Sequence, residues 1–395
     1  MATQERKAAI VGLYEWPKRK DPDVSAMQIK AASVRNALED AGLSWRAVDA
    51  VYDAGDGEGG GLGGVAAYMG FHPTVIDTTQ VGGSSYEFHA AHAMRAIAEG
   101  KCNVAVLSYG SKAATQRIPI GTGGGRAGGS WSTNMEAPYG VTLISNYGMV
   151  AQRHMAEYGT TSAQLAEISV ATRHHATRNP DAQQALIDLA VQGVGDITIQ
   201  DVLDSRIIAD PLHLLECCLV TDGGGAVIIA SPEVARNAKK KPVWLLGSGE
   251  ALKYPTNDND ITTSAAAQSA PIAFGQAGVR PDEIDIAMIY DSFTITVAVM
   301  LEDLGFCKKG EAGAFIEGGR LRYDNPSGPA LNTDGGGLSS NHPGMRGIFL
   351  LMEAARQLRG ESTSQVADAK LAVAHGNGGF LGSLHSGGTI ILGAD

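Results

Sequence analysis

Three side chains that can exchange protons follow apolar runs or stand beside glycines in this sequence. Tyr290 follows the apolar run Ile284–Ile289 in the motif YDSF, and His375 ends another apolar run at the motif HGNGG. His342 lies in NHPG, between a glycine-rich turn and a helix that begins with proline. Histidine and tyrosine are common general acids and bases. Their positions predict a site that handles protons.

Each of these residues also has a structural interpretation. His342 could serve only to cap a helix, and His375 could be a structural histidine in a strand. A polar group at a strand end before glycines more often faces a site, which favours catalysis for His375. Tyr290 could be a core aromatic whose hydroxyl is bonded internally. For Tyr290 both interpretations stay open at this point.

The segment Val75–Met94 contains a strand, a turn of small residues and a helix, an arrangement that often presents a nucleophile. The turn is VGGSS, and Gly82 and Gly83 have no side chain that could attack. Ser84 and Ser85 lack an evident neighbouring base, and capping the helix is the usual role of serine there. The sequence therefore predicts an active-site turn without a nucleophile.

The other reactive residue types give no convincing nucleophile or metal site. Cys307 lies beside two lysines, in a segment expected to be a surface loop. His89 and His92 are three apart on a helix, but no third ligand is identifiable, so no metal is predicted. Buried, inert thiols are expected at the remaining cysteines, which are Cys102, Cys217 and Cys218.

Composition excludes several classes of function. The 395 residues are 44% hydrophobic with a net charge of −11, which argues against nucleic acid or an anionic membrane as partner. Four cysteines in this length do not make a disulfide framework. The start, MATQERKAAIVGLYEW, has no secretory apolar region, and no apolar run reaches membrane-spanning length. A cytoplasmic protein is expected.

The chain contains an internal duplication. AGLSWRAVD (Ala41–Asp49) resembles AGVRPDEID (Ala277–Asp285), each a helix end followed by a strand. DGGGAVIIAS (Asp222–Ser231) resembles HSGGTIILGA (His385–Ala394), each a glycine stretch followed by an apolar strand. Such self-similarity predicts two copies of one structural unit.

The duplication pairs the candidate residues of the two copies. Aligning the helices that end at Gly100 and Gly360 puts Gly82 opposite His342, both at a helix start. Two helix N-termini related by a pseudo-twofold axis would point to a common centre. Polar groups at both turns favour a shared site over a purely architectural repeat.

Each copy alternates helices with short apolar strands, which is typical of a buried mixed sheet in an α/β fold. The N-terminal half is expected to comprise residues 1–112 and 216–237, and the C-terminal half residues 242–395. Residues 113–215 interrupt the first copy and are expected to form a loop domain over the site. The stretch GTGGGRAGGSW in this insert is expected to be a flexible flap.

YDSF, NTDGGGLSSNHPGM (Asn332–Met345) and HGNGG, in this order within a duplicated chain with an insert, resemble the thiolase superfamily. The resemblance covers essentially the whole chain. It is closest to the sterol-carrier-protein-type, or lipid-transfer-protein, branch. It implies the thiolase fold, with two pseudo-repeated mixed-sheet halves in a layered α/β/α/β/α arrangement and an inserted loop domain.

The resemblance also implies roles for residues. The nucleophilic cysteine of thiolases falls on Gly82, its activating histidine on His342, the second cysteine on His375 and the water-holding asparagine on Tyr290. Only His342 matches, so Tyr290, His342 and His375 are the implied catalytic set. Many members of the branch have a tyrosine where this chain has Ser340. The implied substrate-binding residues are Gly82, Gly83, Ser340, Asn341, Asn377 and Gly378.

A thiolase relative without the nucleophile resembles the steroid side-chain aldolases. This implies retro-aldol cleavage of a bulky 3-hydroxyacyl-CoA, with a steroid side chain, to a ketone and a short acyl-CoA. His342 would bind the thioester oxygen, and Tyr290, with or without His375, would handle the proton of the substrate hydroxyl or enolate carbon. The alternatives are an acyltransferase of thiolase-type Claisen chemistry and a non-catalytic acyl-CoA- or sterol-binding subunit.

The implied chemistry needs no covalently bound cofactor, since the coenzyme A thioester is the substrate. The resemblance implies a homodimer joined through a sheet-edge strand, and CNVAVLSYG (Cys102–Gly110) is the expected contributor. It further implies a small zinc-ribbon and OB-fold partner protein, two copies of which would give a heterotetramer.

Overall fold

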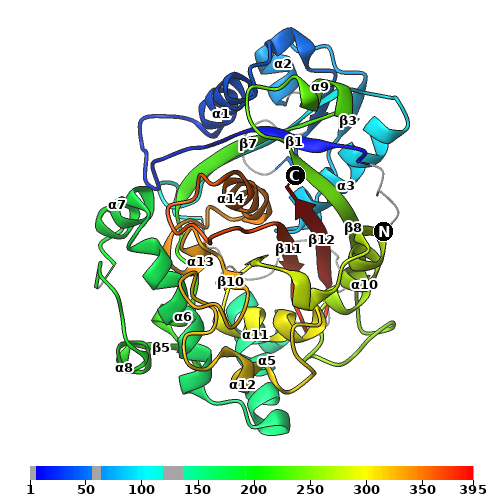
Figure 1. Cartoon of the computed structure of the whole chain (residues 1–395). Coiled ribbons are helices and arrows are strands. Elements are labelled where there is room, and N and C mark those ends of the chain that lie inside the picture. The colour runs from blue at the N-terminus through cyan, green and yellow to red at the C-terminus, as the bar shows by residue number, and fades with distance from the viewer. Residues whose placement is uncertain (1–5, 56–63, 119–136, 192, 395) are drawn as a thin grey trace.

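The computed structural model describes residues 6–55, 64–118, 137–191 and 193–394. One mixed sheet runs through the molecule, and Figure 1 shows it curving between layers of helices. Five of its ten strands come from the first copy of the duplication, in the sheet order β3 (Val75–Asp77), β2 (Ala50–Tyr52), β4 (Val104–Lys112), β7 (Asp222–Ala230) and β1 (Ala9–Glu15).

The second copy contributes its five strands in the matching order. From the outer edge inward they are β10 (Ala330–Leu331), β9 (Ile286–Ile289), β11 (Leu371–Gly379), β12 (His385–Gly393) and β8 (Val243–Lys253). The two copies meet where β1 and β8 pair antiparallel, with Ala9 opposite Trp244. The strand order therefore reads the same from either edge, as the repeat in the sequence predicts.

The helices form three layers on the two half-sheets. The inner layer is α3 (Ser85–Ala98) with α14 (Gly347–Arg359), which contact each other and strands of both halves. On the outer faces, α1 (Ala26–Ala41) packs on the first half and α10 (Ala266–Ala277) on the second. Each interface has its own cluster of buried apolar side chains. This is the expected α/β/α/β/α order.

Local signals explain where the inner and outer helices end. The helix α1 begins after Ser25, whose side chain forms a capping box with Gln28, and it ends at Gly42 in the left-handed conformation. The helix α14 ends in the same way at Gly360, with φ of 77°. These caps fix the lengths of the helices that lie on the sheet.

The segment between β4 and β7 is mainly helical. It contains α5 (Leu143–Tyr158), α6 (Ser162–Ala176), α7 (Pro180–Asp188) and α8 (Ile199–Asp204), then the short strands β5 (Ile207–Ala209) and β6 (Leu212–His213). Both α5 and α6 contact α11 (Thr294–Asp303) of the second copy. The stretch GTGGGRAGGSW lies outside the described residues, and the expected domain boundaries stay a prediction.

The structure corrects two local expectations. CNVAVLSYG forms most of β4, which lies between β7 and β2 inside the sheet, so it is no edge strand. The glycines of HGNGG are part of β11, whose pairing with β12 continues to Gly379, so His375 does not stand at the strand end as expected. Among the described residues, no helix is both long and apolar enough to cross a membrane.

Candidate active site

The structure brings Tyr290 and His342 into direct contact. The Tyr290 hydroxyl lies 2.9 Å from His342 Nε2 and 3.3 Å from the carbonyl oxygen of Gly344. The two rings meet edge to face, with centroids 5.5 Å apart. Both side chains are buried. The two proton-handling groups therefore form one coupled pair.

The strand β9 and the turn before α3 position Tyr290. Tyr290 directly follows β9, and its backbone amide donates to the carbonyl of His375 on the neighbouring strand β11. Its ring lies over Gly83, where a Cβ atom would come within 2.6 Å of Tyr290 Cζ. A glycine at position 83 is therefore what makes room for the tyrosine.

The turn that carries Gly82 is held by its own serine. Ser85 Oγ accepts from the amide of Val81 at 3.0 Å and donates to the carbonyl of Gly82 at 2.6 Å. Gly82 has φ of 77°, a conformation that L-residues with side chains rarely adopt. Ser84 Oγ lies 2.7 Å from Ser386 Oγ, and among the residues that the structure describes neither serine of the turn contacts a base. The serines stabilise the turn and supply no nucleophile.

His342 is held by backbone and side-chain contacts on both sides. Thr221 Oγ1 accepts from the His342 amide at 3.1 Å and donates to Asn341 Oδ1 at 2.9 Å. Arg346 donates to the carbonyl of Asn341 at 3.1 Å and forms a buried ion pair with Asp334. These contacts fix the loop that carries the histidine.

Tyr109 contacts the loop that carries His342, and the sequence analysis did not identify it. It comes from β4 in the first copy, and its hydroxyl donates to the Pro343 carbonyl at 2.8 Å and accepts from the Met345 amide at 2.9 Å. It therefore brackets Gly344, whose carbonyl bonds Tyr290. Tyr109 follows the apolar run Val104–Leu107, and the repeat aligns it with Gly376, so the sequence carried no signal for its role.

We expect Tyr109→Phe to lower turnover about ten-fold or more, because a loosened loop misplaces His342. The loss of two buried hydrogen bonds should cost roughly 1–3 kcal/mol of stability. Steady-state kinetics and thermal unfolding would check both. Tyr52→Phe is the control, since Tyr52 is buried on β2 and packs on His89, away from the loop. Equal turnover of the two variants would contradict a positioning role for Tyr109.

Burial keeps both members of the pair uncharged at neutral pH. Desolvation lowers the pKa of His342 to about 4, with the Arg346 charge acting in the same direction. Desolvation also raises the pKa of Tyr290 well above its ordinary value of 10.0. The neutral imidazole of His342 can accept a proton, and the neutral phenol of Tyr290 can donate one. The pair is therefore suited to acid–base catalysis.

The cysteines offer no activated thiolate. Burial raises the pKa of Cys102 to about 11 and that of Cys217 to about 12. Cys307 also has a pKa of about 12, raised by burial first and by Glu302 second, against only a small opposing effect of Lys309. Burial raises the pKa of Cys218 as well. None of the four is suited to be the missing nucleophile.

The structure does not bring His375 together with this pair. Its Nδ1 lies 2.9 Å from Thr389 Oγ1, which in turn lies 2.8 Å from Ser269 Oγ on the outer helix α10. Side chains alternate across a strand, and the neighbouring Gly376 faces Glu87 of the inner helix α3. His375 therefore points to the outer face of the sheet, and of the three expected residues the structure brings Tyr290 and His342 into contact.

Some of the expected substrate-binding residues lie at the turn beside Tyr290, and the side chains of others point elsewhere. Gly82 and Gly83 adjoin Gly378 and the carbonyl of Asn377, since a Cβ at Gly82 would lie 3.0 Å from Gly378 Cα. The Asn377 side chain instead bonds Tyr147 and His385.

Ser340 and Asn341 do not face Tyr290. The Asn341 side chain bonds Thr221 and donates to Glu15 Oε1 at 3.1 Å. Ser340 packs near Gly335, beside α6.

Partly exposed residues surround the buried pair. Gly344, which accepts from Tyr290, and Gly82, which precedes Gly83, are both partly exposed. So is Cys218, whose amide donates to the carbonyl of Ser292 at 2.9 Å.

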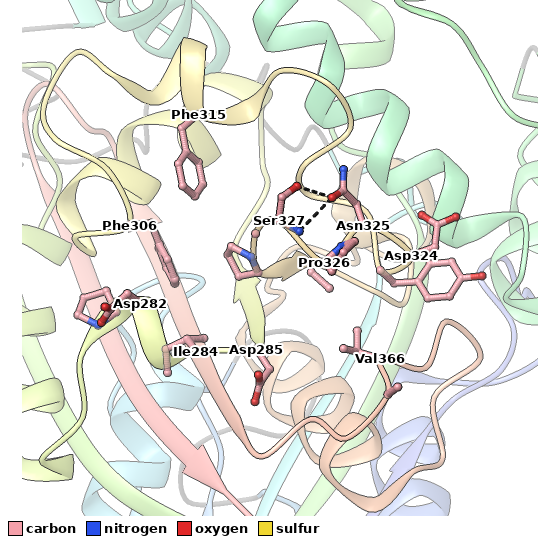
Figure 2. Close-up of a pocket in the computed structure, with 16 residues that line it drawn as sticks. Asp282, Ile284, Asp285, Phe306, Phe315, Asp324, Asn325, Pro326, Ser327 and Val366 are labelled. Atoms are coloured by element: carbon pink, nitrogen blue, oxygen red, sulfur yellow. Dashed lines mark hydrogen bonds between the residues drawn. The ribbon is translucent and has the colours of Figure 1, made fainter.

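A separate pocket of about 720 Å³ lies at the opposite end of β9 from Tyr290. Figure 2 shows Phe306 and Phe315 on one side of it and Asn325 and Ser327 across from them. Its lining, as far as the described residues go, includes three aspartates, Asp282, Asp285 and Asp324, but no lysine or arginine. No expected site residue lines it, and its acidic lining does not suit coenzyme A phosphates. The Tyr290–His342 pair remains the candidate site.

Comparison with known proteins places this arrangement in a family. Residues 247–394 match the family described as Thiolase C-terminal domain-like. The chain is 32% identical to an acetyl-CoA acetyltransferase of Methanothermobacter thermautotrophicus, over 96% of this chain and 98% of the relative. It is 31% identical to the 17-hydroxy-3-oxo-4-pregnene-20-carboxyl-CoA lyase of Mycobacterium tuberculosis, over 91% and 94%.

A solved structure agrees with these relatives. The Ltp2-ChsH2(DUF35) aldolase superimposes with a TM-score of 0.86 at 29% identity, over 98% of both chains. The chain is also 31% identical to the steroid side-chain-cleaving aldolase of Thermomonospora curvata, over 91% of this chain and 92% of the relative. With its duplicated sheet and a glycine where thiolases have their cysteine, the chain belongs to the thiolase superfamily, as a sterol-carrier-protein-type member resembling the steroid side-chain aldolases.

Proposed function

We propose that this protein cleaves a bulky 3-hydroxyacyl-CoA by a retro-aldol reaction to a ketone and a short acyl-CoA. The observation that carries this is the Tyr290 hydroxyl placed 2.9 Å from His342, beside a turn that has no nucleophile. A Claisen reaction of the thiolase type needs a covalent acyl-enzyme, whereas retro-aldol cleavage needs only proton transfer and enolate stabilisation.

The reaction balances without a redox cofactor. Tyr290 passes its own hydroxyl proton to His342 Nε2 as it takes the proton of the C3 hydroxyl, and the O–H electron pair forms the ketone carbonyl. The C2–C3 bonding pair moves onto the thioester fragment as an enolate, whose oxygen accepts a hydrogen bond from His342. Protonation of C2 then gives the short acyl-CoA and restores the Tyr290–His342 pair. A well-placed donor to the enolate oxygen is worth about 3–4 kcal/mol.

The names of two relatives support a steroid side chain as the bulky group. One is a pregnene-carboxyl-CoA lyase and the other a steroid side-chain-cleaving aldolase. The Tyr290 hydroxyl bonds the carbonyl of Gly344, which is partly exposed and has no side chain that would exclude a bulky C3 substituent.

The test is product analysis. Purified protein, alone and with its partner, should convert a 3-hydroxyacyl-CoA with a tertiary C3 carbon to ketone plus short acyl-CoA without added free coenzyme A. Mass spectrometry of both products would establish the bond that breaks. Cleavage of 3-oxoacyl-CoA that occurs only when free coenzyme A is added would contradict the proposal. Tight ligand binding without turnover would support a binding subunit instead.

The acyltransferase alternative is favoured by the acetyltransferase relative and tested by Gly82→Cys. We expect no efficient thiolase activity from this variant. Its Cβ would lie 3.0 Å from Gly378 Cα in a left-handed backbone conformation, and the position of the second thiolase cysteine, His375, faces away. Robust 3-oxoacyl-CoA cleavage by the variant, dependent on free coenzyme A, would show that the site still fits Claisen chemistry.

For assembly we propose a homodimer joined at β3, with a small DUF35-type partner on each subunit. The solved neighbour is a complex of Ltp2 with the DUF35 part of ChsH2. The strand β3 is an open edge of the sheet, and its Ile76 is 64% exposed. An apolar side chain on an open edge favours pairing with a second copy.

We expect Ile76→Lys to convert a dimer to a monomer, because it puts a charge into the paired edge. Light scattering at micromolar concentration would measure the mass. Ile187→Lys is the control, since Ile187 is 57% exposed on α7 and far along the chain from the edge. A wild-type monomer, or an Ile76→Lys variant that remains dimeric, would argue against this interface.

A further inference from the structure

Glu87 is a fully buried carboxyl with no bonded partner. It lies in the first turn of α3, directly after the turn that carries Gly82, and it is 0% exposed. Neither of its carboxyl oxygens has a hydrogen-bond partner among the described residues. Unsatisfied buried polar groups are rare in native proteins, and each calls for a physical explanation.

Glycines from three elements make room for this side chain. A Cβ at Gly347, the first residue of α14, would lie 3.0 Å from Glu87 Oε1 and 2.6 Å from the carbonyl oxygen of Gly83. A Cβ at Gly376 in β11 would lie 2.6 Å from Glu87 Cδ, and one at Gly388 in β12 2.6 Å from Glu87 Cβ. Glu87 thus fills the space that three side chains would otherwise occupy.

Two of these three glycines, and Gly83 next to Gly347, belong to segments that build the site. Gly347 follows the loop of His342, Gly376 lies in the HGNGG motif, and Gly83 lies under Tyr290. The Gly347 amide donates to the Gly83 carbonyl at 3.2 Å, which joins the two copies of the duplication at this point. Glu87 therefore lies at the seam where the turn, the histidine loop and β11 meet.

Charged and titratable groups on the surrounding elements are engaged elsewhere. Before α14, Arg346 pairs with Asp334 and Asp291, and within that helix Glu353 bonds Thr333 and Ser362. On the strands, His375 bonds Thr389 and His385 bonds Asn377. On α3, His89 contacts the Thr79 carbonyl and His92 pairs with Asp77 and Glu250. Among the described residues, none forms an ion pair with Glu87.

An ionised carboxylate without a partner is too costly in such a place, so the group takes up a proton instead. Desolvation raises the pKa of Glu87 well above its ordinary value of 4.5. Because the folded state holds this proton more tightly than the unfolded chain, folding stability falls as pH rises from about 4.5 towards the folded-state value.

We propose that Glu87 is a positioning residue that works as an uncharged carboxylic acid. In this form it packs the seam between the Gly82–Ser85 turn, the start of α14 and β11. Its ionisation would bring water or a counterion to the seam and displace Gly83, and with it the ring of Tyr290. Activity and stability should therefore decline together on the alkaline side. The activity part rests on the proposed function, whereas the stability part does not.

The test compares Glu87→Gln with wild type across pH. Glutamine has nearly the same shape and cannot ionise. Thermal unfolding should show similar melting temperatures at pH 5.5 and a variant more stable by roughly 2–4 °C at pH 9. Its turnover at pH 7 should stay within about three-fold of wild type, and the alkaline fall in turnover should be shallower.

Glu15→Gln is the control, since burial tends to raise the pKa of Glu15 but its partners Arg19 and Arg356 lower it to about 2, so this carboxyl stays charged at both pH values. It should lower the melting temperature at both pH values. If Glu87→Gln fails to fold, Glu87→Leu provides a second uncharged side chain of similar length for the same comparison. Identical pH dependence in wild type and the uncharged variants would overturn the proposal. So would a stable Glu87→Gln protein without activity at pH 7, which would assign Glu87 to proton transfer.

Discussion

Tyr290→Phe should lower turnover of the 3-hydroxyacyl-CoA by about 10²-fold or more, as expected for loss of a general acid or base. The substitution keeps the ring that packs over Gly83 and on His342, and it removes only the hydroxyl. The lost bond to His342 should cost only about 1 kcal/mol of stability. Single-turnover kinetics and thermal unfolding on the same preparation would separate the two effects.

Tyr323→Phe is the matched control for this experiment. The Tyr323 hydroxyl accepts from Arg178 Nε at 3.0 Å, next to the acidic pocket and away from the site. Its loss should leave turnover unchanged at a similar cost in stability. Normal turnover of Tyr290→Phe would mean that Tyr290 is a core aromatic and that another group handles the proton.

Gly83→Ala should abolish most activity and destabilise the fold by about 1–3 kcal/mol. The added methyl group would lie within 2.6 Å of Tyr290 Cζ and would also overlap the carbonyl oxygen of Asn377. The backbone of β11 cannot yield easily, so the tyrosine ring must move away from His342. Displacement of a catalytic group by about 1 Å can cost roughly 10²-fold in rate. Turnover and thermal unfolding would measure the two effects.

Gly275→Ala shows what the same change does where space is free. Gly275 lies within α10, and a Cβ there would meet nothing within 4 Å. Alanine should stabilise this helix by about 0.5–1 kcal/mol and leave turnover unchanged. If Gly83→Ala is as active as Gly275→Ala, Tyr290 does not depend on the space at position 83.

The linear order of motifs was sufficient to predict the fold and both members of the candidate pair, Tyr290 and His342. The sequence contains two similar series of apolar runs alternating with helices, which predicts two mixed half-sheets. The observed sheet confirms this, because its strands follow the same order from each edge to the centre. The motifs NHPG and YDSF identify His342 and Tyr290 because each stands at the end of a regular element, where side chains gather at one point. The sequence alone also shows that position 82, in the predicted active-site turn, is a glycine and cannot supply a nucleophile.

The sequence could not predict on which face of β11 a side chain lies. Motif alignment placed His375 with Tyr290, but one residue along a strand reverses the face, and β11 continues through HGNGG instead of turning. The same limit applied to Ser340 and Asn341, whose directions depend on the loop around Arg346. Register decided the direction of His375, and register depends on pairing with strands far away in the chain.

Contacts between the two copies of the duplication are the other feature that only the tertiary structure decided. Tyr109 reaches from β4 to the loop of His342, and Glu87 fills the glycine-lined seam between α3 and α14. In the sequence each looks like an ordinary core residue, because its role depends on backbone atoms more than 200 positions away. Local periodicity determines which elements form. The close approach of the two inner helices, permitted by glycines on the opposing elements, determines which side chains meet.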